Sequence, residues 1–391
     1  MFGRHYLASR PWLSTVQQSG AGFAFTSGGD VTVASNCFAV LAAELLGDWP
    51  LEGQVFAEAG THIAAAQCED GLWHDPELVP ETLEGRHGLD YMQVLTSYFA
   101  VHALDALGRR PVYPLRFLNR FMDARESVDW LLGWDLSQFW YASNEIMWLL
   151  SFLEYESGQG NCQADIVIEA LLGKLDEMQD PQTGYWGTDR GANLFNGMAG
   201  AFHIYYFYFS RGRRINHVAR IIDNTLSLQH EDGLFNRGGG GGACHDLDAI
   251  DILVKFSMLT DYRAADVSAA LRRAYHALWK AQNADGGFCE LVWRPYKSWK
   301  RRIGELFGLD KLLHRPIQQQ PGRFRYGGWS KMQCRKNESN AWAMWFRPLA
   351  FALISVRYPG RYLGNGDWTF RRLPGLGWCD SSKVSACPFS M

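Results

Sequence analysis

Two kinds of hydrophobic segment alternate along the chain. In the first kind, apolar residues recur at intervals of three and four positions, the pattern of a helix with one buried face; these are residues 55–66, 166–178, 217–228 and 267–281. Segments of the second kind are apolar and aromatic on nearly every face; these are residues 31–46, 89–107, 143–154, 195–209, 246–259 and 339–356. Because a helix that is apolar all round is buried on all sides, the alternation predicts an inner set of helices surrounded by an outer set.

A short motif, Q-x-x-D-G-x-[WF], lies between outer and inner segments. Its copies are residues 67–73, 179–186, 229–235 and 282–288, with a degenerate copy at 18–23. The starts at 18, 67, 179, 229 and 282 differ by 49, 112, 50 and 53, which indicates a repeat of about 50 residues. The gap of 112 is about two periods, so we expect one further unit near residues 120–137 that lacks the motif. The chain therefore contains six units.

The residue types of the motif suit a turn between two helices. Glycine permits positive φ, aspartate accepts hydrogen bonds from the turn, the glutamine amide can bind a neighbouring unit, and the aromatic ring fills the gap between hairpins. We interpret the motif as structural. Six helical hairpins predict an all-α fold, a closed (α/α)6 toroid, as a single domain over residues 1–391. An insertion interrupts it at about 289–337, and an irregular tail at about 359–391 wraps the outside or covers one end.

The repeat and its alternation of outer and inner helices resemble the toroid of terpene cyclases and protein prenyltransferase β subunits, in which Gln-and-Trp repeats recur. The resemblance extends over nearly the whole chain. It implies a pocket inside the ring of inner helices. Similar turns occur in other toroids, including some polysaccharide-processing enzymes, so the resemblance is more specific for the fold than for the reaction.

Composition narrows the class of protein. Hydrophobic residues make up 47% of the 391, with 16 Trp, 23 Phe and 16 Tyr, which is enough for a large core and excludes general disorder. The net charge of -3 gives no overall attraction to nucleic acid. We find no secretory apolar region and no run long enough to span a bilayer, and the eight Cys form no C-x-x-C pair. We therefore expect a cytoplasmic protein, with room for peripheral membrane contact.

Polar residues gather where the inner helices are predicted to begin. In a closed ring, the loops after the motifs meet at one end, so these positions surround one pocket mouth. Helix capping explains several of them, including Thr32, Asn193 and Ser339. It does not explain a second carboxylate or amide one turn inside an apolar helix. We therefore expect catalytic roles for Asp90 and Glu145 and substrate-binding roles for Asn36, His87, Tyr91, Asn144, Asn196, His203 and Asn340.

The most specific chemical pattern lies at residues 238–251. Five consecutive glycines lead into His245, Asp246, Asp248 and Asp251 at the start of a buried helix. Two close carboxylates do not ionise together easily, so one keeps its proton and can act as a general acid. The segment resembles the D-x-D-D acid of class II terpene cyclases. By position, Asp246 and Asp248 match the first and the central Asp, the latter being the proton donor, while Ala249 stands in place of the last Asp.

Aromatic residues of the inner helices are candidates for a wall that stabilises a carbocation by cation–π contacts, with ordinary core packing as the alternative. They are Tyr91, Trp140, Tyr141, Phe195, Phe202, Trp342 and Trp345, of which we assign Trp342 to substrate binding. Zinc would need Cys244 and His245 together with Cys334 or His87, as in the prenyltransferase β subunit. Because the chain has no second ligand pair with zinc spacing, we predict no metal site.

The insertion is rich in arginine, lysine and aromatic residues. It is either a solvated basic loop or a lid over the pocket mouth whose cations hold a diphosphate, a sugar nucleotide or an acidic polysaccharide. The binding candidates in it are Arg323, Arg325, Lys331 and Arg335. No cofactor is predicted, although a substrate with a diphosphate would bring Mg²⁺.

Three functions remain open. The first is a class II-like terpene or meroterpene cyclase, an isomerase or lyase, in which Asp248 protonates a polyprenyl substrate. The second is a carbohydrate-active lyase, epimerase or hydrolase of polysaccharide biosynthesis that pairs Asp246 or Asp248 with Glu145, His87 or Tyr91. The third is a non-catalytic toroid that binds a partner. The expected ligand is a small isoprenoid or saccharide, and we expect no nucleic acid.

Overall fold

The structure is a computed structural model that describes residues 7–78, 88–188, 193–236, 238–292, 324–325, 329–335, 337–362 and 368–382. These residues are mostly helical, which confirms the predicted all-α class. The strands among them are short and form two antiparallel pairs: β1 (Gln17–Gln18) with β2 (Gly22–Phe23), and β3 (Phe324–Arg325) with β4 (Gln333–Cys334).

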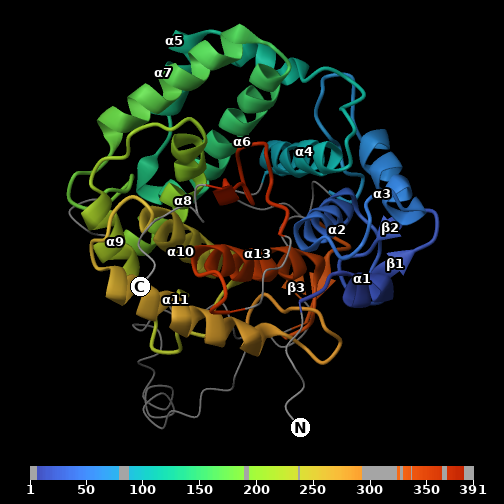
Figure 1. Ribbon diagram of the computed structural model, residues 1–391. Coiled ribbons are helices and arrows are strands. Elements are labelled where there is room, and N and C mark those ends of the chain that lie inside the picture. Colours follow the sequence, from blue (N-terminus) through green and yellow to red (C-terminus); the bar gives the residue numbers. More distant parts are fainter. Residues whose placement is uncertain are drawn as a thin grey trace, which may run out of the picture.

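The helices form an inner and an outer set (Figure 1). The inner set is α2 (Val33–Leu46), α4 (Leu89–Ala106), α6 (Phe139–Gly158), α8 (Leu194–Ser210), α10 (Ala243–Phe256) and α13 (Ala341–Arg357). The outer set is α1 (Arg10–Val16), α3 (Gln54–Ala65), α5 (Ala124–Leu132), α7 (Cys162–Met178), α9 (Val218–Ser227) and α11 (Ala264–Leu278), with 3-10 turns η2 (Arg116–Phe121), η3 (Leu136–Gln138) and η4 (Trp279–Ala281). Each inner helix contacts the next in this order, and α13 also contacts α2.

Burial follows the predicted division between the two sets. Nearly every residue of α2 and α13 is buried, and in α13 this includes a charged side chain, Arg347. The outer helix α9 buries Ile221 and Ile222 while its neighbours Ala219 and Arg220 are exposed. The unit without a motif supplies α5 as its outer helix. The periodicity of the sequence therefore locates both layers.

The glycines of the four motif copies have the backbone conformation that the motif predicts. Gly71, Gly184, Gly233 and Gly286 have φ of 93°, 78°, 92° and 85°, a region that residues with a side chain rarely adopt. Space is limited as well: a Cβ on Gly71 would lie 2.4 Å from the Pro114 carbonyl oxygen. The motif glycines therefore shape the turn that follows each outer helix, and at Gly71 the missing side chain also allows the next unit to approach.

The motif glutamines join consecutive units. The Gln67 Nε2 donates to the carbonyl oxygens of Gly71, in its own turn, and Tyr113, in the next unit, at 3.1 and 2.9 Å. Gln229 repeats the arrangement, donating to Gly233 and to Ala270 of α11 at 2.9 Å each. These amides act as cross-links between hairpins, because each satisfies backbone carbonyls on both sides of a unit boundary.

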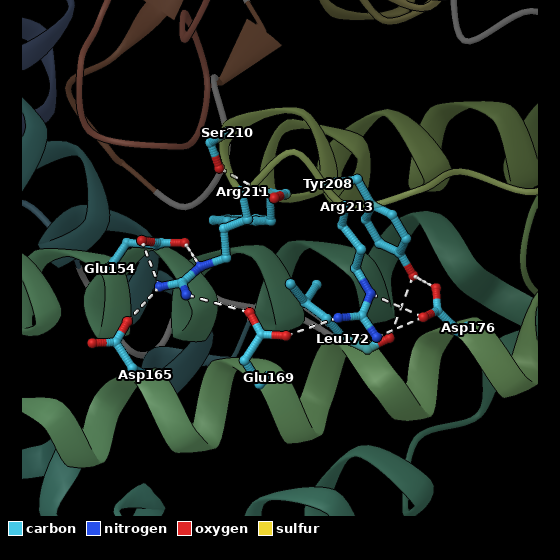
Figure 2. A network of polar contacts seen from close by, with 10 residues as sticks. Glu154, Asp165, Glu169, Leu172, Asp176, Tyr208, Ser210, Arg211 and Arg213 are labelled. Carbon is cyan, nitrogen blue, oxygen red and sulfur yellow. Dashed lines mark hydrogen bonds and ion pairs between the residues drawn. The ribbon is translucent and has the colours of Figure 1, made fainter.

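An ion-pair network strengthens the contact between the third and fourth units (Figure 2). Arg211, directly after α8, pairs with Glu154 of α6 and Asp165 of α7 at 2.6 and 2.8 Å. Two residues further on, Arg213 pairs with Glu169 and Asp176 of α7 at 2.8 and 2.6 Å. An isolated surface ion pair contributes at most about 1 kcal/mol to the stability of a fold. In this network two arginines each bind more than one carboxylate, and together they link α6, α7 and the end of α8.

The segment of residues 368–382, here called the C-terminal strap, lies against the carboxyl ends of the inner helices. Arg371 pairs with Glu44 of α2 at 2.7 Å and with Asp105 of α4. Lys255 of α10 donates to the Trp378 carbonyl oxygen at 3.0 Å. The strap thus contacts the end of the inner helices opposite to the one at which the motif loops enter them.

Candidate active site

The glycine run shapes the backbone that leads into α10. Gly239, Gly240 and Gly241 have positive φ of 72°, 76° and 69°, three such residues in succession. A Cβ on Gly241 would lie 2.5 Å from the Asp246 Oδ2. The glycines therefore let the chain turn tightly around the first carboxylate of α10.

Asp246 is fully occupied by this turn. Its Oδ1 accepts from the backbone N–H of Phe235 at 2.7 Å, and its Oδ2 accepts from the N–H of Gly242 at 2.9 Å and from Arg347 Nη1 at 2.5 Å. Both Asp246 and Arg347 have side chains that are 0% exposed. Both oxygens of the Asp246 carboxyl group are therefore bound by protein donors.

Two other units have a side chain in the same role. The Asn36 Oδ1 accepts from the N–H of Phe23 at 2.7 Å, and the Ser97 Oγ accepts from the N–H of Trp73 at 2.8 Å. In each case a polar residue of an inner helix binds the N–H of the motif's aromatic residue. In the fifth unit Asp246 makes this contact, with the N–H of Phe235. A structural role in the turn therefore accounts for the position of Asp246.

Asp248 has a different environment. It is 1% exposed, and among the described residues neither carboxyl oxygen has a hydrogen-bond partner. Burial raises its pKa well above the usual range, and the nearby charges of Asp251 and Asp246 raise it further. Positions two apart on a helix point about 200° apart, so Asp248 points away from the contact that holds Asp246. Burial and the neighbouring carboxylates therefore both favour the protonated form of the Asp248 carboxyl group.

Aromatic rings of three inner helices meet on the side that faces the centre. The ring of Phe38 in α2 lies 4.9 Å from Phe99 in α4 and 5.0 Å from Trp342 in α13. The helices α4 and α13 each contact α2, which lies between them in the order of inner helices. The ring centres of Phe99 and Trp342 are nevertheless only 5.8 Å apart. Trp342 also stacks on Phe346 at 3.8 Å. We call Phe38, Phe99, Trp342, Trp345 and Phe346 the aromatic cluster.

Tyr206 of α8 links the acid to this interior. Its hydroxyl group is buried, and burial raises its pKa, with further contributions from Asp251, Tyr98 and Asp248. Tyr98 belongs to α4, on the other side of α6 in the order of inner helices. Asp248 and Tyr98 therefore both lie within electrostatic range of the Tyr206 hydroxyl group.

A second polar group lies between α4 and α6. The Asn144 Nδ2 donates to the Tyr91 hydroxyl at 3.2 Å, and the Tyr91 ring lies 4.8 Å from Trp148. Burial raises the pKa of Glu145 to about 7; Arg120 opposes this shift and Asp90 adds to it. This group therefore contains one carboxyl that titrates near neutral pH.

The Asp90→Asn variant is expected to lower the pKa of Glu145 from about 7, because the amide removes the like charge that adds to the shift. Arg120→Gln is expected to raise the same pKa, because it removes the opposing cation. Titration of selectively ¹³C-labelled carboxyl groups by NMR measures both shifts. The matched control is Asp266→Asn, an exposed position of α11; two shifts of the same sign would contradict the expectation.

His203 and His245 lie between α6, α8 and α10. The Ser143 hydroxyl is 2.9 Å from the His203 Nδ1. Burial and, to a smaller extent, the nearby His245 lower the pKa of His203 to about 3, so His203 is neutral near pH 7. The His245 ring lies 5.0 Å from Trp140 and 4.9 Å from Phe195. His245 therefore packs edge to face among rings near the start of α10.

The other predicted site residues have protein partners or lie elsewhere. The Asn36 Nδ2 donates to Ala21, the Asn340 Oδ1 caps α13 by accepting from Ala343, and the Asn196 Nδ2 donates to Ser137 at 3.3 Å. Lys331 pairs with Glu77 at 2.8 Å. Arg335 is exposed, with its backbone N–H donating to Glu338, and Arg325 lies in β3. His87 and Arg323 lie outside the described residues.

Three charged residues of this region were not among the predicted site residues. Arg347 donates to Asp246 and, at 2.5 Å, to the Glu290 carbonyl oxygen. Burial raises the pKa of the Glu290 side chain to about 7, opposed by Arg347. Lys255 lies buried at the other end of α10. The sequence alone could have identified two of these residues. Arg347 and Lys255 are single cations inside apolar helices, where an unpaired charge is costly, so each of them is expected to have a buried partner.

Within the part of the chain that the structure describes, no three His, Cys, Asp or Glu side chains are grouped as ligands for a metal ion. Over the same residues, no helix combines the length and the apolar character needed to cross a membrane.

Proteins similar to this chain are found among solved structures. No protein-family model matches the sequence, and no curated protein matches it. The chain is similar to the type II terpene cyclase MstE from Scytonema. One matching structure is a variant of that enzyme in complex with its substrate, geranylgeranyl dihydroxybenzoate. It is 13% identical in sequence to this chain and gives a TM-score of 0.49, and the match covers 88% of this chain and 95% of that one. The apo enzyme gives 14% and 0.46 over 88% and 95%, and a second variant with this substrate gives 14% and 0.42 over 83% and 88%.

Proposed function

We propose that this protein is a class II-like terpene or meroterpene cyclase on an (α/α)6 toroid, with Asp248 as the general acid. The observation that carries the proposal is the environment of the Asp248 carboxyl group: it is buried, has no hydrogen-bond partner among the described residues, and has a pKa that burial raises well above the usual range. Leaving a buried polar group unpaired costs free energy. A role in catalysis explains why the site carries that cost.

The proposed reaction begins with transfer of the Asp248 proton to a terminal alkene or epoxide of a polyprenyl substrate. With an alkene, the π electrons form the new C–H bond; with an epoxide, the ring oxygen takes the proton and one C–O bond breaks. Either step leaves a carbocation on the substrate and a carboxylate on Asp248, which takes up a proton from solvent before the next turnover. Internal double bonds then attack the cation in turn and form rings, and loss of a proton to solvent ends the reaction. This sequence needs no cofactor.

The interior suits such a cation. Rings attract cations through their negative faces, and the aromatic cluster presents three indole or phenyl groups from α13 alone, Trp342, Trp345 and Phe346. The new Asp248 carboxylate has no ordered donor to stabilise it, so the carbocation is its nearest countercharge. A dry interior also limits the capture of the cation by water.

The carbohydrate alternative is supported less well. It requires an acid and a base that act together, but Asp246 is bound by Arg347 and two N–H groups. Glu145 responds to Arg120 and Asp90, whereas Asp248 responds to Asp251 and Asp246. The carboxyl groups therefore fall into two separate clusters, and the protonated one is near rings.

Reaction in D₂O tests the proposal. Purified protein is incubated with polyprenyl phenols, their epoxides and polyprenyl diphosphates, the last with and without Mg²⁺, and products are analysed by mass spectrometry. Initiation by protonation of an alkene places a single deuterium at the carbon that was protonated, whereas protonation of an epoxide oxygen forms no C–D bond. Asp266→Asn should behave as wild type. The proposal fails if none of these substrates is cyclised while uronic-acid oligomers are consumed, or if the product cyclised from a substrate without an epoxide carries no carbon-bound deuterium.

A further inference from the structure

A buried ion pair lies one helical turn beyond the acid. Asp251 follows Asp248 by three residues, on the same face of α10. The Lys255 Nζ lies 2.7 Å from the Asp251 Oδ2, and the two side chains are 2% and 5% exposed. The other Asp251 oxygen, Oδ1, has no hydrogen-bond partner among the described residues. One carboxylate oxygen is thus bound to a cation, while the other is left within the interior.

Lys255 is held in place by groups from two other elements. Its Nζ donates to the Trp378 carbonyl oxygen of the C-terminal strap at 3.0 Å. The same atom lies 5.0 Å from the centre of the Tyr206 ring and 5.2 Å from that of Trp378. A carboxylate, a carbonyl and two ring faces therefore surround the ammonium group.

We propose that Lys255, held by the Trp378 carbonyl, fixes Asp251 as a carboxylate beside Asp248, so that the C-terminal strap is part of the acid site. The inference rests on the proposed role of Asp248. Asp251 and Lys255 are positioning residues, because they act on the acid and not on the substrate.

The charges around the acid support this assignment. Burial is the main cause of the raised pKa of Asp248, and Asp251 is the first of the charges that add to it. Burial also raises the pKa of Asp251, but there the charge and the hydrogen bond of Lys255 oppose the shift. Lys255 therefore makes two similar carboxyl groups unequal: it opposes the raised pKa of Asp251, whereas no cation among the described residues opposes that of Asp248.

Other titratable groups face this cluster from each described element around it. They are Cys244 and Asp246 on α10, Tyr206 on α8, Arg347 on α13, and Cys379 on the strap. Arg347 is bound to Asp246. Burial raises the pKa of Tyr206 and of both cysteines, which keeps all three neutral near pH 7. The Asp251–Lys255 pair is the ionised unit nearest to Asp248 on its own face of the helix.

A buried ion pair seldom stabilises a fold more than apolar residues of the same size would. Its position next to an unpartnered acid therefore has more consequence for proton transfer than for folding. A carboxylate at this distance in a poorly solvated interior favours the protonated form of its neighbour, in proportion to the charge that it keeps.

Infrared titration of the purified full chain tests the inference without a substrate. The C=O stretch of protonated Asp248 is assigned as the band lost in Asp248→Asn, and its disappearance with rising pH is followed in each variant. Asp251→Asn and the double variant Asp251→Asn/Lys255→Met are both expected to lower the midpoint by about one pH unit or more, since a nearby negative charge is removed. Asp251→Glu keeps a carboxylate at this position, so the Asp248 midpoint should return most of the way to its wild-type value. Asp266→Asn should leave the Asp248 midpoint at the wild-type value.

The double variant guards against misfolding, because it leaves no unpaired buried charge. Where a polyprenyl substrate is turned over, the loss of activity at high pH should move down with the infrared midpoint, while the KM changes little. An unchanged Asp248 midpoint in both variants overturns this inference and leaves the proposed function standing. If wild type shows no protonated band that Asp248→Asn removes, the proposed function itself fails.

Discussion

The Asp248→Asn variant is expected to lose about 10²- to 10⁴-fold in turnover of a polyprenyl substrate and, at the same time, to be more stable than wild type at neutral pH. Activity falls because an amide has no proton to give to an alkene. Stability rises because the buried, unpartnered carboxyl group must bind a proton in order to fold, whereas the amide is neutral in both states.

The sign of the pH dependence follows from the raised pKa of Asp248 in the folded protein. Above about pH 4, the ordinary pKa of aspartate, the unfolded chain loses this proton while the folded chain keeps it. The free energy of unfolding of wild type therefore decreases as pH rises from about 4 to the folded pKa. Asp248→Asn removes this slope.

Urea denaturation at several pH values, with Asp266→Asn as the matched control, measures the effect. The stability difference between Asp248→Asn and wild type should widen between about pH 5 and about pH 8. A constant difference, or full activity in the variant, would show that Asp248 is not the buried acid.

Arg347→Met is expected to destabilise the protein by about 3 to 5 kcal/mol. The substitution leaves Asp246 as a fully buried carboxylate without its cation, and the Glu290 carbonyl oxygen loses its donor as well. Removing one partner of a buried pair costs more than replacing both, since an uncompensated charge remains. Urea denaturation at neutral pH measures the loss.

The double variant Asp246→Asn/Arg347→Met should recover part of that stability. The first unit shows why: Asn36 already performs the same contact with a neutral amide, accepting from the N–H of Phe23. In the double variant an asparagine at 246 can accept from Phe235 in the same way. A double variant less stable than Arg347→Met alone would contradict the equivalence of the two positions.

Much of the fold could be predicted from the sequence because its signals are local. Helical periodicity located the two layers, and the glycine of each motif marked a turn whose positive φ is a property of that residue. The helix α10 begins at Ala243, three residues before the predicted start, because Gly242 precedes it and the run of glycines ends there. Asp246 consequently lies one turn inside the helix.

The candidate site could be predicted only in part, because its partners are distant in the chain. Asp248 stood out as a carboxylate in an apolar helix, and in the structure it is buried and without a hydrogen-bond partner among the described residues. Asp246 looked equivalent to it, yet its ion pair with Arg347 spans 101 positions. The contact of Lys255 with Trp378 spans 123. Such pairings depend on how helices far apart in the chain pack against one another, which no local pattern records.

The strap also has a consequence for the order in which the protein can mature. Arg371 binds Glu44 and Asp105 across 327 and 266 positions of the chain. During synthesis Glu44 and Asp105 are made long before Arg371. Neither can form its ion pair while the later part of the chain is still being made. Contacts between such distant positions form slowly. We expect the helical layers to assemble first, with the acid site completed last, when the strap docks and Trp378 reaches Lys255.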